Sequence, residues 1–191
     1  INAMNPTWAL MGFIDDNPQT HDKVVNGYRV LGGRDWLAHN GGEVYVTCAI
    51  GSSKTRKRLI SELKHARFAT LVDPKVEISE RVSMGEGCII CAGTILTVDI
   101  TIGSHVIINL GCTIGHDATI NDYVTINPSV NVSGHTYLGE CVEMGTGSQI
   151  IQGIRVGDGT IVGAGAVVVK ELPGECTAVG APAKPIKFHT R

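Results

Sequence analysis

The sequence has few aromatic residues, few charges and no marked excess of either sign. Aromatic side chains make up 5% of its 191 residues and charged side chains 18%, with a formal net charge of −2. There is no basic block, which argues against nucleic acid and anionic membranes as partners. Hydrophobic residues reach 43%, which predicts a globular chain. No apolar run approaches the length of a membrane span.

No secretory signal peptide is visible, although the chain opens on Ile1 rather than on methionine. Two of the six cysteines, Cys88 and Cys112, take the small inward position of the repeat described below. Cys88 and Cys91 form a C-x-x-C pair, but along a strand one side chain should point inward and the other outward. We therefore expect reduced thiols and a cytoplasmic protein rather than a zinc or redox pair.

A six-residue repeat runs from Thr70 to Glu171. It consists of seventeen hexads without an insertion, and the third position is apolar in each, from Val72 to Val168. The first position is small or β-branched, and the fourth is often Gly or Asn, which tolerate positive φ better than other residues. A fixed short period of this kind predicts a solenoid, and a hexapeptide period predicts a parallel β-helix.

Three hexads would make one triangular coil, so that side chains eighteen residues apart stack on one another. Seventeen hexads then give nearly six coils, about 27 Å tall at roughly 4.8 Å per strand spacing. Leu172-Pro173-Gly174 ends the regularity. Residues 177–186 are expected to leave the prism as an extended arm with two prolines.

The first 69 residues do not follow the hexad rule. We expect short strands at 8–14 and 43–50, the second of them buried, and a helix at 54–67 whose basic residues face away from its apolar side. Strand, Gly51-Ser52 turn and helix make half of a βαβ unit, a turn that suits phosphate groups. A simple helix cap explains Gly51-Ser52 as well, and a solvated turn explains Asp15-Asp16. The first strand and glycine-rich loop that normally open a nucleotide-binding unit are not in this sequence, and they are either truncated away or unneeded.

Stacking by eighteen residues gathers several polar side chains on the outer surface. Gly134 falls above His116 and His135 above Asp117, while Asn109 lies seven residues before His116 on the adjoining wall. A histidine beside a carboxylate can act as a general base, and a glycine one coil away can offer its N–H to an oxyanion. An exposed corner histidine without a catalytic role, or a metal site made by His116, Asp117 and His135, agrees with the same spacing.

The hexads resemble those of the hexapeptide-repeat acyltransferases. The whole chain resembles the sialic acid O-acetyltransferase and UDP-4-amino-sugar N-acetyltransferase family, through the Asn109…His116-Asp117 spacing and the segments GFIDDNP at 12–18, VLGG at 30–33, AIG at 49–51 and GAPAK at 180–184. The resemblance implies a mainly β protein with a left-handed parallel β-helix at 70–171. A partial Rossmann-like acceptor-binding domain at 1–69 would precede it, and a C-terminal arm at 172–191 would follow.

The resemblance also implies an activity, namely transfer of an acetyl group from acetyl-CoA to an amino or hydroxyl group of a sugar. The acceptor would be a nucleotide-linked amino sugar or sialic acid. His116 matches the family's general base, Asp117 the acid that follows it, and Asn109 the amide placed seven residues earlier. A homotrimer is implied, with each CoA groove between two neighbouring helices, and no metal is expected as a cofactor.

Further residues match the binding positions of the family. Gly134 matches a glycine whose N–H meets the acyl carbonyl, and Thr125, Thr146 and Ala164 match positions that line the CoA groove. Thr125 departs from relatives that have histidine there. The residues expected to hold a nucleotide sugar are Asp15, Asp16 and Gly51, and acceptor binding should be weak without the first strand and glycine loop.

Two other functions remain open at this point. A metal-dependent lyase of the carbonic anhydrase type can be built on the same prism, and it needs histidines that converge at a subunit boundary. A non-catalytic β-solenoid that serves as a binding module is the second alternative.

Overall fold

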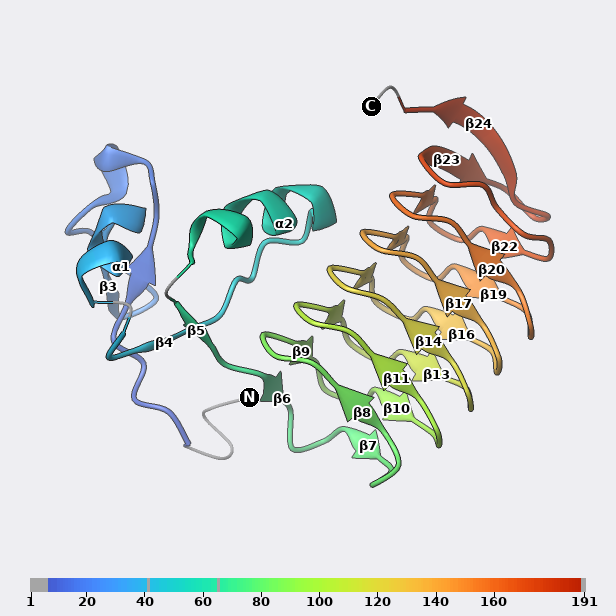
Figure 1. Cartoon of the computed structure of the whole chain (residues 1–191), viewed down its shortest axis with the longest axis horizontal. Coiled ribbons are helices and arrows are strands. Elements are labelled where there is room, and N and C mark those ends of the chain that lie inside the picture. The colour runs from blue at the N-terminus through green and yellow to red at the C-terminus, as the bar shows by residue number, and fades with distance from the viewer. Residues whose placement is uncertain (1–6, 41, 65, 190–191) are drawn as a thin grey trace.

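The computed structural model describes residues 7–40, 42–64 and 66–189. The first elements form a small unit beside a column of stacked coils, and the coils advance steadily from the first repeat to the C-terminal strands (Figure 1). None of the helices in the described part of the chain is long and apolar enough to cross a membrane.

Each hexad forms one strand of two residues, from β6 (Leu71–Val72) to β22 (Val167–Val168). Neighbouring strands pair in parallel with partners eighteen residues apart, as Ile95 pairs with Thr113. The predicted parallel β-helix is therefore confirmed. The strands between the first and the last are β7 (Glu77–Ile78), β8 (Ser83–Met84), β9 (Ile89–Ile90), β10 (Ile95–Leu96), β11 (Thr101–Ile102), β12 (Ile107–Ile108), β13 (Thr113–Ile114), β14 (Thr119–Ile120), β15 (Thr125–Ile126), β16 (Asn131–Val132), β17 (Tyr137–Leu138), β18 (Glu143–Met144), β19 (Gln149–Ile150), β20 (Arg155–Val156) and β21 (Ile161–Val162).

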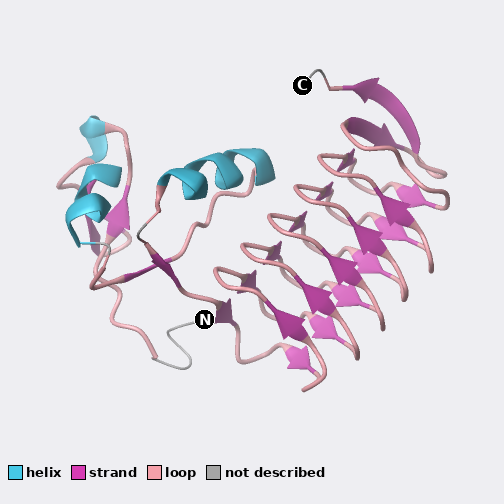
Figure 2. Ribbon diagram, viewed as in Figure 1, coloured by secondary structure: helices cyan, strands magenta, loops and turns pink. Residues whose placement is uncertain are grey.

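The strands form three faces around the core, and successive strands pass from face to face (Figure 2). The eight-stranded face has the order β24-β23-β21-β18-β15-β12-β9-β6. The six-stranded face has the order β22-β19-β16-β13-β10-β7, and the five-stranded face β20-β17-β14-β11-β8. Each pair of faces meets at an edge made of the short turns between strands.

The third hexad positions fill the core. All of them from Ile90 to Val168 are buried, and small first positions such as Cys88 and Cys112 pack between them. Val72, Ile78 and Met84 are less buried, because the first coil has no coil beneath it. Branched aliphatic side chains thus fill the prism, which explains why so few aromatic residues are needed.

The sequence predicts positive φ at the fourth hexad position, but in the structure it occurs at the sixth. Asp117 and His135, both sixth positions, have φ of 58° and 54°. Fourth-position glycines instead allow close approach between coils, because a Cβ on Gly115 would lie 2.5 Å from the Gly134 nitrogen. Asparagine at the fourth position bonds the next coil, as Asn109 Nδ2 donates to the Ile126 carbonyl at 3.1 Å.

The N-terminal segment is α/β but less regular than predicted. Its elements are β1 (Phe13–Ile14), the 3-10 helix η1 (Pro18–Thr20), β2 (Val24–Val25), β3 (Tyr28–Gly32), α1 (Arg34–Asn40), β4 (Tyr45–Val46), α2 (Ser53–Glu62) and β5 (Arg67–Phe68). β1 and β2 flank β3, and β4 pairs in parallel with β5. The two expected strands are shorter than predicted, and the expected helix ends at Glu62. The second strand is not buried as predicted: Tyr45 is exposed, because the β4–β5 sheet has only two strands.

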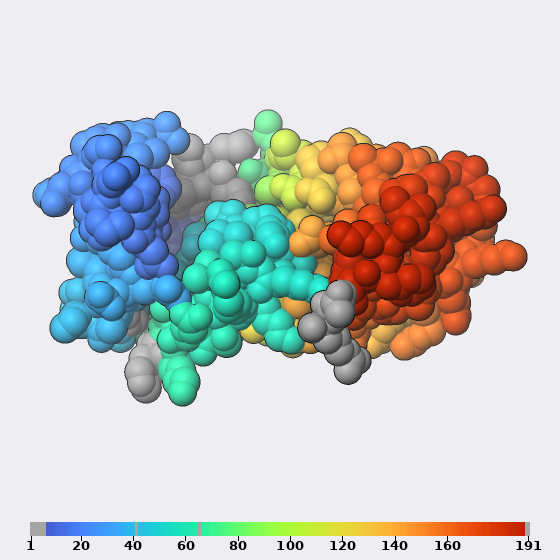
Figure 3. All heavy atoms as spheres, turned by 90° about the horizontal axis from the view of Figure 1, so that it is seen from above, coloured from blue at the N-terminus to red at the C-terminus, as the bar shows by residue number. Residues whose placement is uncertain are grey.

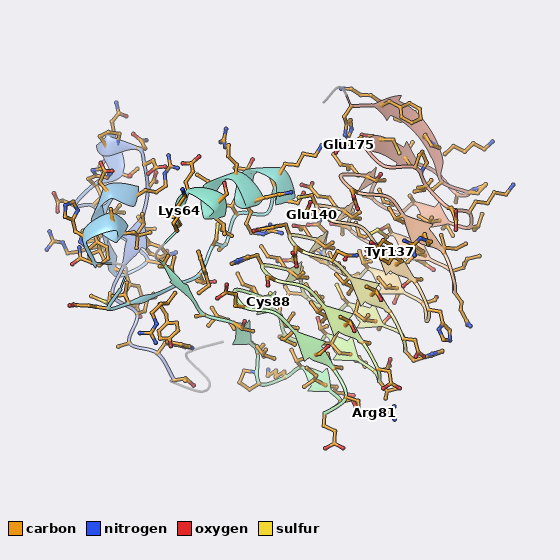
Figure 4. The ribbon with its side chains drawn as sticks, in the orientation of Figure 1. Lys64, Arg81, Cys88, Tyr137, Glu140 and Glu175 are labelled. Carbon is orange, nitrogen blue, oxygen red and sulfur yellow. The ribbon has the colours of Figure 1, made fainter. Side chains whose placement is uncertain are left out.

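α2 lies against the eight-stranded face, between the N-terminal unit and the coils (Figure 3). Its basic residues do not all face solvent, because Arg56 is 0% exposed. Arg56 donates to the carbonyl oxygens of Ile50, Gly51, His105, Tyr123 and Val124 and to Oγ1 of Thr125. Lys57 and Lys54 pair with Glu140 and Glu175 on the adjacent coils (Figure 4). α2 is thus fixed to the β-helix by polar contacts.

The C-terminal residues do not leave the prism as predicted. β23 (Cys176–Val179) pairs in parallel with β21, and β24 (Lys184–Phe188) returns antiparallel to β23. Cys176 and Ala178 are fully buried. The hairpin therefore covers the end of the hydrophobic core, which an arm projecting into water would leave exposed.

Candidate active site

The predicted polar cluster forms at one edge of the prism. His116 and Asp117 lie in the turn between β13 on the six-stranded face and β14 on the five-stranded face. Gly134 and His135 lie in the next turn along this edge, where the His135 N–H donates to the His116 carbonyl at 2.8 Å. We call these four residues the histidine corner. Arg81, which marks the start of the same edge in Figure 4, lies on the side away from α2.

Asp117 lies between the two histidines of the corner. Its Oδ2 is 2.7 Å from His116 Nδ1 and 3.7 Å from His135 Nε2. The two imidazole rings are perpendicular, with centroids 4.9 Å apart. When His116 donates its Nδ1–H to the carboxylate, Nε2 keeps the lone pair that a general base requires.

The carboxylate of Asp117 is held in its charged form. The hydrogen bond from His116 lowers the pKa of Asp117 below its ordinary value, and the charges of His135 and His116 act in the same direction. An ionised Asp117 fixes the orientation of the His116 ring and stabilises the imidazolium that forms when the ring takes a proton.

Gly134 provides room for His116 and a donor beside it. A Cβ at Gly134 would lie 2.6 Å from His116 Nε2, so only glycine lets the ring rest on this turn. Among the hydrogen bonds between described residues, none uses the Gly134 amide as donor. A backbone N–H close to a base can stabilise a developing oxyanion.

Asn109 does not lie at the histidine corner. It lies in the turn between β12 and β13, at the edge where the eight-stranded and six-stranded faces meet. The whole of β13 separates it from His116, because seven residues carry the chain around one face of the prism. Thr146 and Ala164 lie at the same edge as Asn109, and both are exposed.

Thr125 is not open to a groove in this chain, contrary to the expectation for a CoA contact. It is only 2% exposed beneath α2. Its Oγ1 donates to the Gly51 carbonyl at 2.7 Å and accepts from Arg56 at 3.0 Å. Thr125 and Gly51 thus help to attach α2 to the coils.

Asp15 and Asp16 lie in the N-terminal unit. Asp15 Oδ1 accepts from the Asn17 amide at 2.9 Å, and Asp16 pairs with Arg34 at 2.6 Å. Asp16 and Arg34 line a hollow of about 720 Å³ between α1 and the end of α2, together with Glu62. Asp15 and Gly51 do not line this hollow, so the three expected sugar-binding residues are not brought into one pocket.

His116, Asp117 and His135 form the one group in the described part of the chain that could hold a metal ion. All six cysteines have free thiols. Cys88 and Cys112 are buried in the core, as their hexad position predicts.

Comparisons with known proteins identify the family. Residues 1–63 match the family described as the PglD N-terminal domain. The fold is similar to WeeI from Acinetobacter baumannii AYE, with a TM-score of 0.89 and 33% identity over 97% of this chain and 91% of that chain. It is also similar to the acetyltransferase domain of PglB from Neisseria gonorrhoeae FA1090 in complex with acetyl coenzyme A, with a TM-score of 0.87 and 30% identity over 94% and 88% of the two chains. The chain belongs to the hexapeptide-repeat sugar acetyltransferases.

Another structure similar to this sugar acetyltransferase is PerB from Caulobacter crescentus in complex with CoA and GDP-perosamine. The TM-score is 0.85 and the identity 30%, over 92% of this chain and 84% of that chain. Curated relatives match over a shorter stretch. The serine acetyltransferase of Buchnera aphidicola subsp. Schizaphis graminum is 45% identical over 53 residues, which span 28% of this chain and 20% of that protein.

The burial of Arg56 is not predicted from the sequence. The sequence predicts that the basic residues of α2 face away from its apolar side, whereas Ser53, Arg56 and Ile60 follow helical spacing and are all buried. That spacing was a usable signal. The eighteen-residue stacking places His135 above Asp117, and the two side chains are 3.7 Å apart in the structure.

Proposed function

We propose that this sugar acetyltransferase transfers an acetyl group from acetyl-CoA to an amino group of a sugar that is linked to a nucleotide. The observation that carries the proposal is the 2.7 Å pair of His116 Nδ1 and Asp117, with the His116 ring lying against the turn at Gly134. Acetyl-CoA is the co-substrate, since the PglB domain holds acetyl coenzyme A and PerB holds CoA.

The reaction is a direct transfer with His116 as the general base. The acceptor nitrogen attacks the thioester carbonyl carbon while His116 Nε2 takes its proton. The Gly134 N–H donates to the carbonyl oxygen as negative charge develops there. The carbon–sulfur bond then breaks, and the thiolate of CoA leaves and takes up a proton.

An amine is the acceptor group we favour. A similar structure from Caulobacter crescentus is described as a perosamine N-acetyltransferase with CoA and GDP-perosamine. We assign acceptor binding to residues 1–69, with Asp15, Asp16 and Gly51 as candidate contacts, and acyl transfer to residues 70–171. The hollow of about 720 Å³ beside Asp16 supports this division. We treat residues 172–191 as a separate C-terminal segment.

The active site is completed by a neighbouring chain in this proposal. His116 lies at one edge of the six-stranded face, while Asn109, Thr146 and Ala164 lie at the other. A homotrimer that brings these edges of neighbouring chains together would place Asn109 near His116 and form the CoA groove between them. The free thiols agree with a reducing compartment, and we assign the protein to the cytoplasm.

The test is acetyl-CoA turnover against a panel of sugars. The panel contains nucleotide-linked amino sugars, the same sugars with hydroxyl in place of the amine, and sialic acid. We expect thiol release and an acetylated product with an amino sugar, and acetyl-CoA binding by calorimetry without any acceptor. Turnover confined to the hydroxyl acceptors would overturn the amine assignment, and absence of acetyl-CoA binding would overturn the transferase itself.

A further inference from the structure

The histidine corner contains one more ligating group than a catalytic pair needs. We propose that His116, Asp117 and His135 bind a divalent transition metal of the Zn²⁺ type, and that the bound ion switches off His116 as a base. The binding site stands on the geometry of the three side chains. The consequence for acetyl transfer rests on the proposed function.

The three side chains have the chemistry and spacing of a metal site. Two imidazoles and a carboxylate are ligands that Zn²⁺ prefers, at about 2.0–2.2 Å from the metal. Ligands of a tetrahedral ion are then about 3.4 Å apart. Here the ligand atoms all lie within 4.8 Å of one another, and Asp117 Oδ2 is 3.7 Å from His135 Nε2. The shorter distance, 2.7 Å from Asp117 Oδ2 to His116 Nδ1, is that of a hydrogen bond. If the ion binds at Nδ1, the ring proton moves to Nε2 and the imidazole stays neutral.

The backbone holds two of the ligands in place. Asp117 and His135 occupy equivalent positions in neighbouring coils, and both have positive φ. The Asp117 N–H donates to the Val98 carbonyl at 3.1 Å, and the His135 N–H to the His116 carbonyl at 2.8 Å. Only side-chain rotations are needed to close the site. These side chains are 48%, 43% and 55% exposed for His116, Asp117 and His135, which leaves room for a water at a fourth position.

The neighbouring turns along this edge add no further ligand to the site. Asp99 lies one coil before Asp117, but its carboxylate pairs with Arg81 at 2.6 Å. Gly153 lies one coil after His135 and has no side chain. Among the described residues, no lysine or arginine pairs with the carboxylate of Asp117. Its charge is therefore available to a metal ion.

An ion bound at the histidine corner would prevent His116 from acting as a base. It would occupy a ring nitrogen of His116 and withdraw Asp117 from its hydrogen bond, so that the ring could no longer take a proton from an acceptor. Binding requires neutral imidazoles, so protons compete with the metal and acid should weaken it.

The direct test is calorimetric titration of Zn²⁺ into the full chain after treatment with a chelator, with Co²⁺ absorption as a second readout. His135→Asn removes one ligand, and asparagine tolerates the positive φ at this position. His39→Asn is the matched control, because His39 is an exposed histidine on α1 that bonds the Asp35 carbonyl. We expect one ion per chain in the wild type and in the control, and an affinity at least about tenfold lower in His135→Asn.

A chemical readout separates the metal site from acetyl transfer. Diethyl pyrocarbonate acylates neutral imidazole, and mass spectrometry follows its reaction with His116 and His39 in the same tube. Zn²⁺ should slow the modification of His116 in the wild type but much less in His135→Asn, and it should leave His39 unchanged. If acetyl transfer is observed, Zn²⁺ should inhibit it in proportion to occupancy.

The outcomes distinguish the two proposals. Equal Zn²⁺ affinity in the wild type and His135→Asn, or unchanged modification of His116 at saturating Zn²⁺, would overturn the metal site whether or not the enzyme is active. Failure of the chelator-treated chain to transfer acetyl groups would count against the proposed function alone. Full activity with one Zn²⁺ bound would refute the switch.

Discussion

His105 and His135 occupy the same hexad position but have different surroundings. Both are sixth positions with positive φ, 57° and 54°. His105 is 5% exposed and packs between the rings of Phe68 and Tyr123, while its carbonyl accepts from Arg56. His135 lies at the exposed edge with Asp117. The repeat gives both histidines the same backbone conformation. His105 is buried under other side chains and supports the fold, whereas His135 is exposed and available for chemistry.

In the region that α2 covers, around His105 and Tyr123, the buried polar groups stabilise the fold. Arg56 donates hydrogen bonds to carbonyls of the turns at His105 and Tyr123, and burial lowers the pKa of both Arg56 and His105. The histidine corner keeps a lone pair and a backbone N–H for other molecules. The following experiments test this difference.

Removal of Arg56 should have the largest effect on stability. Arg56→Leu leaves several buried carbonyls without a donor, and we expect the free energy of unfolding to fall by about 3 kcal/mol. Arg58→Leu, at an exposed position of the same helix, should change it by no more than about 0.5 kcal/mol. Urea unfolding measures both. Equal losses in the two variants would show that the buried contacts do not anchor α2.

A methyl group at Gly134 should strongly reduce catalysis without unfolding the chain. In Gly134→Ala the added Cβ would displace the His116 ring, and we expect kcat/KM to fall about a hundredfold. Gly42→Ala is the control, because a Cβ there meets no atom within 4 Å. Steady-state kinetics, with melting temperatures to confirm folding, make the comparison. An unchanged rate in Gly134→Ala would remove His116 Nε2 from the reaction.

The loss of charge at Asp117 should have a smaller effect. Asn tolerates the positive φ of this turn, so Asp117→Asn removes the carboxylate and preserves the backbone. The pair is exposed to solvent, which weakens its contribution, so we expect kcat/KM to fall only about fivefold. Asp99→Asn, one coil earlier on the same edge, should leave the rate unchanged. Similar losses in both variants would assign the effect to general charge rather than to the hydrogen bond with His116.

The smallest effect concerns pH and the covered region. Burial lowers the pKa of His105 below 6.5, so above that pH the ring is neutral in both the folded and the unfolded chain. As pH falls below 6.5 the unfolded chain binds the proton more strongly, and stability decreases until the folded pKa is reached, by at most about 1.4 kcal/mol per pH unit.

Urea midpoints at pH 7, 6 and 5 measure this dependence. His105→Asn should have a shallower loss of stability with falling pH than the wild type, while His39→Asn should follow the wild type. If His105→Asn lost stability with falling pH as steeply as the wild type, the pH dependence would not come from His105.

The sequence predicted the regular part of the fold because one periodic rule applies to every strand. Seventeen strands, the eighteen-residue stacking and the inward third position all follow from it. The same rule placed His116 beside Asp117 and Gly134 above it. The expected cluster was wrong for Asn109, because seven residues are more than one hexad and carry the chain across a whole face to the next edge.

Contacts between distant segments could not be predicted. Thr125 was expected in a groove, and its cover by α2 depends on Arg56, which lies 69 residues earlier in the chain. The C-terminal hairpin replaced the expected arm because Cys176 and Ala178 are buried at the end of the core. Such contacts follow from packing in three dimensions, because helical spacing marks the buried face of α2 but does not state which turns that face contacts.

The most direct test of His116 as the general base combines two measurements on His116→Ala. These are its kinetics with a nucleotide-linked amino sugar and its binding of acetyl-CoA by calorimetry. If His116 is the base, kcat/KM falls by at least about a hundredfold, while the dissociation constant of acetyl-CoA changes by no more than about twofold. A variant that folds, binds acetyl-CoA and transfers the acetyl group at the wild-type rate would contradict it.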